Sequence, residues 1–293
     1  MGMKHVGDAA AWAEETFGSA GLGDARRTRR LVRLGAALAA ETGASASKAC
    51  GKSDADVEGA YRLLRNDEVS PREILAAGFR ATARRAGSLD TFPAVEDSTT
   101  LSYTHQAVDE LGDLGGTADS SPRGVWVHSV LLVDAASSRT VGLIEQSYWM
   151  REPEARGKRH DRRQRDYEEK ESYKWQHASE QTRLRLGDEV MKRVVSVCDR
   201  EADVYPYLAH KMGAGERFVV RAQWDRTVLS DGGTNPEKGR PSAVLNAAPV
   251  AMQVTVDVPQ RSGRPAHTAT LTLRARKVRL RRPRPLPVKY PAR

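Results

Sequence analysis

The sequence predicts an α/β protein in which a basic helical segment precedes a mixed β-sheet. Three observations support this fold class. Residues 8–86 have the spacing and capping residues of helices, and from about residue 88 apolar strand-like runs alternate with helical segments. Two of these runs are joined by a turn short enough for an antiparallel hairpin. With 293 residues, the chain can form one large domain or two to three ordinary ones.

The first strongly patterned helix is expected after Asp24, a residue that can cap a helix N-terminus. Its apolar stripe would consist of Leu31, Leu34 and Leu38, at positions i, i+3 and i+7. Another face of the same helix carries arginines at helical spacing, namely Arg26, Arg30 and Arg33, with Arg27 and Arg29 beside them. This segment therefore combines a core-facing stripe with a dense positive surface.

Two more helices complete the predicted N-terminal unit. One carries an apolar stripe formed by Val57, Tyr61 and Leu64, with Arg62 off the stripe. The other begins at "SPREILAAG", where Ser70 is the expected N-cap and proline occupies the first helical position. We expect a compact, basic, helical domain over residues 1–87.

The pattern then changes to strands. "TFPAVEDSTTLSY" reads as one strand, and "GVWVHSVLLVDA" and "TVGLIEQSYWM" read as a hairpin. A charged loop over residues 151–172 leads into a helix, which is followed by strand "RVVSVCD", a helix and strand "ERFVVRA". This order predicts a mixed sheet over residues 88–222 with an antiparallel hairpin at one side.

The C-terminal part differs again. Residues 223–248 are rich in turn residues, and "MQVTVDV" and "TATLTLRARKVRL" alternate apolar and polar residues, as half-buried strands do. The segment "RRPRPLPVKYPAR" is too rich in proline for a regular helix. Residues 223–293 are therefore expected to form a β-strand region with a Pro/Arg-rich tail.

Composition restricts the function classes. The net charge of +9 and the pI near 9.7 favour a polyanionic partner, with a generally basic surface as the alternative. No run of 18 apolar residues is present, so no membrane partner is expected. Cys50 and Cys198 are too few for a disulfide framework, which favours reduced thiols and a cytoplasmic location.

Two predicted strands carry carboxylates that are candidates for metal binding. Asp199 follows "RVVSVC", and Asp97 lies within the first predicted strand. If the two strands are neighbours, these carboxylates could face each other and share a divalent cation such as Mg²⁺. The alternative for Asp199 is a helix N-cap, with Glu201 and Asp203 favouring the positive end of that helix.

Several stretches stand out together, among them "GSAGLGDARRTRRLV", "EGAYRLLRN", "AVEDSTTLSY", "VCDREADVYPYL" and "ERFVVR". These stretches are collinear with, and over about residues 5–222 resemble, the DDE transposases of the insertion-sequence-four (IS-four) family. The resemblance implies a helical DNA-binding domain, followed by an RNase H-like core that a β-strand insertion interrupts. It further implies a cut-and-paste DNA transposase that acts at transposon ends in double-stranded DNA.

The resemblance also implies roles for individual residues. Asp97 and Asp199 would be the first two acids of the DDE triad and would hold Mg²⁺, or Mn²⁺ in its place. Arg221 would lie near the scissile phosphate, with a plain surface cation as the alternative. The expected contacts to the transposon end are Arg26, Arg27, Arg30 and Arg62. For these four arginines, an ordinary solvated helix face is the alternative.

The sequence departs from the family at the third acid, a glutamate that the family carries beyond its strand insertion. The acids after residue 221 are Asp225, Asp231, Glu237 and Asp257, and none lies in a comparable helical context. The expectation is a C-terminally truncated transposase in the bacterial cytoplasm at the nucleoid, with impaired cleavage and with a full-length transposase or a second copy as a further partner. A non-enzymatic DNA-end binder and a metal-dependent nuclease without joining activity remain the alternatives.

Overall fold

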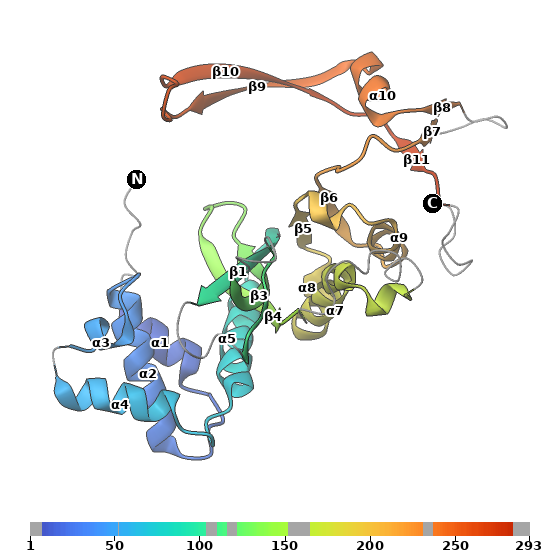
Figure 1. Ribbon diagram of the computed structural model, residues 1–293. Coiled ribbons are helices and arrows are strands. Elements are labelled where there is room, and N and C mark those ends of the chain that lie inside the picture. Colours follow the sequence, from blue (N-terminus) through green and yellow to red (C-terminus); the bar gives the residue numbers. More distant parts are fainter. Residues whose placement is uncertain are drawn as a thin grey trace. The chain divides into compact units, whose positions relative to one another are not determined.

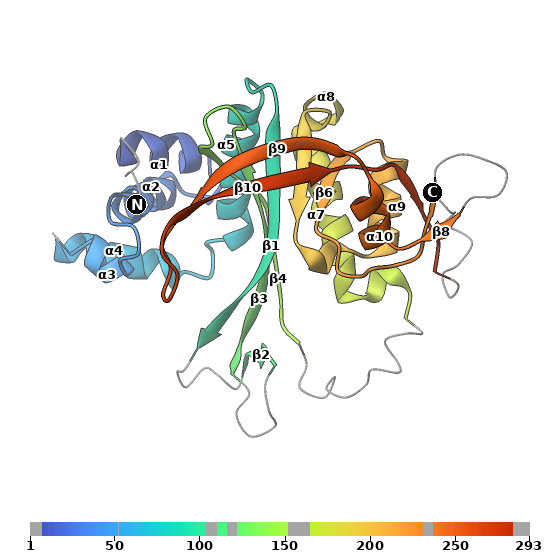
Figure 2. The same ribbon diagram turned by 90° about the horizontal axis from the view of Figure 1, so that it is seen from above.

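The computed structural model describes residues 8–51, 53–103, 110–115, 122–151, 165–230 and 237–283. The chain forms two compact units (Figures 1 and 2). The first unit comprises Met1–Asp199 and Glu216–Val220, and the second comprises Arg200–Gly215 and Arg221–Arg293. The boundaries predicted after residues 87 and 222 remain sequence-based predictions.

The first unit begins with the helices α1 Ala9–Phe17, α2 Ala25–Ala40, α3 Ala46–Ala49, α4 Asp54–Leu64 and α5 Pro71–Ala86. The three expected helices are α2, α4 and α5, whereas α1 and α3 were not individually predicted. The predicted caps are confirmed. The Asp24 carboxylate accepts a hydrogen bond from the N–H of Arg26, and Ser70 accepts one from Glu73 at the start of α5. Each cap satisfies an amide that the first helical turn leaves without an intrahelical partner.

The predicted apolar stripes of α2 and α4 are each confirmed only in part. Leu31 and Leu34 of α2 are buried as expected, whereas Leu38 is 37% exposed. The predicted stripe of α4 is confirmed only at Val57, which packs against the core that contains Leu31 and Leu34. Leu64 is 61% exposed, and the helix instead buries Leu63 together with two small residues, Gly59 and Ala60. Small residues let α2 and α4 approach closely, but they contribute little to a hydrophobic pattern.

The first unit also contains a mixed sheet. Its strands are β1 Phe92–Tyr103, β2 Gly112–Asp113, β3 Arg123–Val133, β4 Thr140–Trp149, β5 Val194–Cys198 and β6 Arg217–Val220. The main path runs β4-β3-β1-β5-β6, with the short β2 also paired to β3. The β1–β3 and β3–β4 pairs are antiparallel, and the β1–β5 and β5–β6 pairs are parallel. The predicted mixed sheet with an antiparallel hairpin at one side is confirmed.

Helices α7 Lys174–Leu186 and α8 Asp188–Met191 follow two 3₁₀ turns, Tyr167–Glu169 and Glu171–Tyr173. Gly187 separates the two helices at φ 76°, a backbone conformation that favours glycine. Side chains from α5, α7, α8 and the sheet share one core, whose members include Ala86, Phe92, Leu132, Ile144, Ala178 and Val194. Most of the predicted charged loop, residues 152–164, lies outside the described residues.

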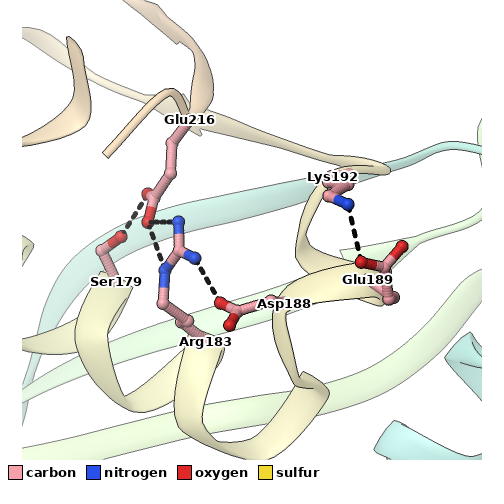
Figure 3. Close-up of polar contacts among 6 residues, drawn as sticks. All are labelled: Ser179, Arg183, Asp188, Glu189, Lys192 and Glu216. Carbon is pink, nitrogen blue, oxygen red and sulfur yellow. Dashed lines mark hydrogen bonds and ion pairs between the residues drawn. The ribbon is translucent and has the colours of Figure 1, made fainter. Parts of the chain in front are cut away.

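A polar network ties the last core strand to these helices (Figure 3). Glu216 directly precedes β6, and its side chain is 3% exposed. Its carboxylate accepts hydrogen bonds from Ser179 at 2.7 Å and from Arg183 at 2.9 and 3.1 Å. Burial alone would lower the pKa of Arg183, but the bonds to Glu216 and Asp188 outweigh it and raise that pKa. The network thereby links α7, α8 and the chain entering β6.

The second unit contains a 3₁₀ turn at Arg200–Ala202 and the helices α9 Tyr205–Gly213 and α10 Pro241–Ala247. Its strands are β7 Val228–Ser230, β8 Lys238–Gly239, β9 Val250–Val258, β10 His267–Arg274 and β11 Val278–Leu280. The sequence pattern did not predict α10. The pairing of β9 with β10 makes a two-stranded ribbon (Figure 2). This ribbon is exposed along most of its length, so the predicted half-burial of these strands is wrong.

Asp203 has a different role from the one the sequence suggested. Helix α9 begins only at Tyr205, and the Asp203 carboxylate accepts the backbone N–H of Gln223 at 2.8 Å and pairs with Arg226. Asp203 therefore secures the chain that leads to β7 and does not act at the end of the helix.

Two further predictions concern the whole chain. Cys50 and Cys198 are both buried and neither forms a disulfide, as expected for structural thiols. Burial raises the pKa of the Cys50 thiol, and the nearby Asp56 carboxylate raises it further. Among the helices that the structure describes, none is both long and apolar enough to cross a membrane.

Candidate nucleic-acid interface and carboxylate pair

The basic face of α2 borders a hollow that we call the α2 groove. Four of its arginines line this groove: Arg26, Arg29, Arg30 and Arg33. The opposite wall includes Gly59 and Ala60 of α4, and the groove has a volume of about 690 Å³. Asp56 and Glu41 also border it, so the four arginines leave an excess of positive charge.

Gly59 of α4 positions the Arg30 side chain. Arg30 Nη1 donates to the carbonyl oxygen of Gly59 at 3.4 Å. A methyl group at residue 59 would lie 2.9 Å from the Arg30 Cζ, so glycine provides the space that the guanidinium occupies. The contact explains why α4 has a glycine in mid-helix, where this residue otherwise costs about 0.5–1 kcal/mol relative to alanine.

The groove arginines keep their charge available. Within the described part of the chain, none of the four forms an ion pair with a carboxylate. Guanidinium groups of this kind bind phosphate oxygens in two-pronged geometry, and each neutralised phosphate releases counterions. The α2 groove therefore suits a phosphodiester backbone.

The other two predicted DNA contacts lie outside this groove. Arg27 Nη1 donates to the carbonyl oxygen of Leu22 at 3.1 Å, and its Nη2 pairs with Glu68. Arg62 is 73% exposed and pairs with Glu58 one helical turn away, with its Nε 2.8 Å from the carboxylate. Of the four predicted contacts, Arg26 and Arg30 thus lie together in the α2 groove. Arg27 instead binds residues of its own domain, and Arg62 lies on an exposed face of α4.

A comparison with known families bears on this surface. Residues 9–69 match the family described as transposase DNA-binding. The transposase DNA-binding match covers α1 to α4 and ends directly before the cap of α5. It contains the α2 groove and all four of the predicted DNA-contacting arginines. The match supports DNA as the partner of this region, and it supports a transposase or DNA-binding role for the chain.

The two predicted catalytic carboxylates lie on neighbouring strands of the first unit. The parallel register of β1 and β5 pairs Glu96 with Cys198. Continued by one residue, the same register places Asp97 beside Asp199, which follows the last residue of β5. Asp97 is exposed and Asp199 is half-buried. The Asp97 carboxylate also accepts the N–H of Ser98 at 2.7 Å.

Two adjacent carboxylates offer the hard oxygen donors that Mg²⁺ prefers, so the ligand atoms of this pair are of the type that binds a divalent cation. Over the described ranges, no group of three or more His, Cys, Asp or Glu side chains is arranged to hold a metal. Asp225 accepts hydrogen bonds from the N–H and Oγ of Ser242, which lower its pKa, and Asp257 accepts one from Thr268. Asp231 lies outside the described residues.

Arg221 follows β6 directly and belongs to the second unit. Its side chain is exposed. The predicted role of Arg221 beside a scissile phosphate stays a prediction.

The opposite face of β1 is built differently. Glu96 and His128 are buried, with His128 Nε2 3.9 Å from Glu96 Oε2. His128 Nδ1 lies 3.0 Å from the hydroxyl of Ser98, and its ring contacts Trp175 edge-on at 4.6 Å between centroids. Trp175 is 1% exposed, so this tryptophan packs in the core of the unit. Asp97 is thus exposed between a buried Glu96 and a half-buried Ser98.

Arg29 and Arg33 also line the α2 groove, although they were not among the expected DNA contacts. Their spacing from Arg26 and Arg30 was the available signal, because residues three, four and seven apart share a helix face. Nothing in the sequence separated Arg27 from this set, since its partner Glu68 is 41 residues away.

Proposed function

We propose that this chain is a DNA transposase polypeptide of the DDE type, related to the IS-four family and within it similar to the transposase of the kanamycin-resistance transposon, transposon five. The observation that carries the proposal is the coincidence of the transposase DNA-binding match with the arginine-lined α2 groove. In this account Arg26 and Arg30 hold the phosphate backbone of a transposon end. Arg27 supports the domain that presents them.

The strand order supports an RNase H-like core. When the five main strands are numbered along the chain, their order across the sheet is third, second, first, fourth, fifth. The second strand runs antiparallel to the other four. That order and direction are those of the RNase H-like sheet that the family resemblance implies. Of the proposed catalytic acids, Asp97 lies on the first strand and Asp199 directly follows the fourth.

The chemistry follows from these positions. A divalent cation, when bound, supplies Lewis-acid polarisation of a phosphate oxygen. Asp97 and Asp199 would hold that cation, and the N–H of Ser98 would orient the Asp97 carboxylate. Because the described residues supply two such acids and not three, we propose that this chain binds DNA ends but cleaves them weakly by itself.

The test separates binding from cleavage. Duplexes that the chain enriches from a random pool are placed in a plasmid, which is then incubated with the chain and Mg²⁺ or Mn²⁺. We expect specific binding, with cleavage that is faint and disappears in Asp97→Asn. Strong cleavage would refute the impairment, and cleavage without joining would favour a nuclease.

A non-enzymatic DNA-end binder is the second candidate, and the absence of a three-ligand metal group among the described residues favours it. End binding that is unchanged in Asp97→Asn and Asp199→Asn, with no cleavage by the parent chain, would establish this function instead.

A further inference from the structure

A second basic groove lies in the first unit, away from the α2 groove. It runs between α5, β4 and α7, and we call it the α5 groove. Its volume is about 980 Å³. Residues that define it are Arg72, Phe79, Arg80, Arg84, Tyr148 and Arg185. No residue of this groove falls within the transposase DNA-binding match at residues 9–69.

Three arginines of α5 lie along this groove, and among the described residues none of them forms an ion pair with a carboxylate. Arg80 donates to the carbonyl oxygen of Ser19 at 3.2 Å, and Arg84 donates to that of Glu15 at 2.9 Å. Neither bond neutralises a guanidinium, because both acceptors are uncharged. The Glu15 carboxylate itself bonds to Arg85. Arg72 is exposed and has no hydrogen bond or ion pair within the residues that the structure covers.

The one carboxylate in the groove wall is already paired. Glu145 binds Arg185, which also donates to the carbonyl oxygen of Ile144 at 3.0 Å. The Arg185 guanidinium lies over the Phe79 ring, 4.3 Å from its centroid. On the α7 side of the groove, the charges of Arg185 and Glu145 are thus paired with each other. The net positive charge of the groove therefore comes from the arginines of α5.

The spacing of the charges selects the kind of ligand. Arg72 and Arg84 are twelve residues apart on one helix, which corresponds to about 18 Å at roughly 1.5 Å per residue. A single phosphate cannot reach both ends. One DNA strand carries a charge about every 3.4 Å of helix axis, so a strand lying along α5 would present about five phosphates. Tyr148, 62% exposed, adds a hydroxyl that can donate to a phosphate oxygen.

We propose that the α5 groove binds the phosphodiester backbone of duplex DNA without sequence preference, as a second DNA contact of the first unit. The inference rests on the proposed function for the identity of the polyanion. The groove offers guanidinium and hydroxyl donors suited to phosphates, and none of the features above reads a base.

The salt dependence of binding tests the proposal. The full chain is titrated with a labelled 40-base-pair duplex of arbitrary sequence, and the affinity is followed from about 50 to 200 mM salt. Arg72→Gln should reduce the slope of log affinity against log salt by about 0.9, and should weaken binding about five- to tenfold near 0.1 M salt. Arg72 has no partner to lose among the described residues, so the thermal unfolding of this variant should match the parent.

Arg139→Gln is the matched control, because Arg139 is an exposed arginine of the same unit that lies outside both grooves. An Arg72→Gln slope equal to that of the parent would overturn the proposal. Equal losses in both variants would also overturn it, because they would indicate general surface charge.

A crosslink provides a readout that does not depend on affinity. Tyr148→Cys introduces an exposed thiol, whereas Cys50 and Cys198 are buried. Labelled with a benzophenone maleimide, this position should crosslink to the duplex on illumination, and single-stranded DNA of the same length should crosslink less. Absence of a duplex crosslink would contradict the proposal.

The two proposals fail separately. If Arg26→Gln abolishes enrichment of specific duplexes while Arg72→Gln has no effect on the salt slope, the α5 groove is wrong and the proposed function stands. If Arg26→Gln leaves specific binding intact, the proposed function is wrong at the α2 groove.

Discussion

At the scale of single residues, adjacent arginines on α2 have different partners. Arg26 lines the α2 groove and is exposed, whereas Arg27 binds Leu22 and Glu68 within its own domain. We therefore expect these neighbouring side chains to differ in role, with Arg26 available for ligand binding and Arg27 contributing to domain stability.

This division can be measured. Arg26→Gln should lower the salt slope of DNA binding by about 0.9 with no change in unfolding. Arg27→Gln should instead reduce the free energy of unfolding by about 1 kcal/mol, because its bond to the Leu22 carbonyl is lost. Denaturant titration of both variants, run beside duplex binding, checks the contrast. A destabilised Arg26→Gln would contradict the assignment.

Gly59 provides a second residue-scale prediction. Gly59→Ala raises helix propensity, but its methyl group would lie 2.9 Å from the Arg30 Cζ and displace the guanidinium. DNA affinity should fall several-fold, comparable to the loss of about one phosphate contact, while stability is unchanged or slightly higher. Gly78→Ala on α5 is the control, since no atom lies within 4 Å of its added methyl. Equal DNA affinities in the two variants would refute the role of Gly59.

At the scale of elements, the sheet depends on the chain that enters β6. Glu216 is buried and accepts hydrogen bonds from Ser179 and Arg183 of α7 (Figure 3). Glu216→Gln should reduce the free energy of unfolding by about 1.5–3 kcal/mol, the usual range for hydrogen bonds to charged groups.

The control for this prediction appears in the same view. Glu189 pairs with Lys192 at 2.6 Å, but its side chain is 85% exposed. Glu189→Gln should therefore change stability by less than about 0.5 kcal/mol, since exposed ion pairs contribute little. Similar losses in the two variants, measured by urea denaturation, would show that burial of Glu216 does not matter.

The junction of α1 and α5 should respond to acid. A hydrogen bond from Arg85 holds the pKa of Glu15 below its ordinary value of 4.5, and the positive charges of Arg85 and Arg84 lower it further. A depressed folded-state pKa contributes stability above the ordinary value and loses it as the pH falls through the folded-state pKa. Glu15→Gln should thus unfold at a lower temperature than the parent at pH 7, and the gap should close below about pH 4. A gap of constant size would contradict this contribution.

At the scale of the whole molecule, local signals in the sequence predicted local structure well. Asp24 and Ser70 cap helices because capping depends on residues only a few positions away. The mixed character of the sheet and its antiparallel hairpin followed from the succession of strands and helices. The pairing of β1 with β5 could only be assumed from the sequence, because a contact between residues as far apart as 96 and 198 produces no local sequence pattern.

The failures have physical causes as well. The buried face of α4 uses Gly59 and Ala60, which a hydrophobic pattern does not detect, so Tyr61 and Leu64 were assigned to the core in their place. The ribbon β9–β10 alternates as a half-buried sheet would, yet its pairing is confined to two strands and leaves it exposed. The roles of Arg27 and Asp203 depended on partners 41 and 23 residues away.

The central claim is that the arginine-lined α2 groove recognises a specific DNA end. The most direct measurement is selection of bound duplexes from a random-sequence pool by the full chain, repeated with Arg26→Gln/Arg30→Gln. The account predicts that the parent chain enriches one related set of sequences. The double variant lacks two phosphate contacts and should bind this set too weakly to enrich it. Enrichment of no sequence by the parent, or of the same set by both proteins, would contradict it.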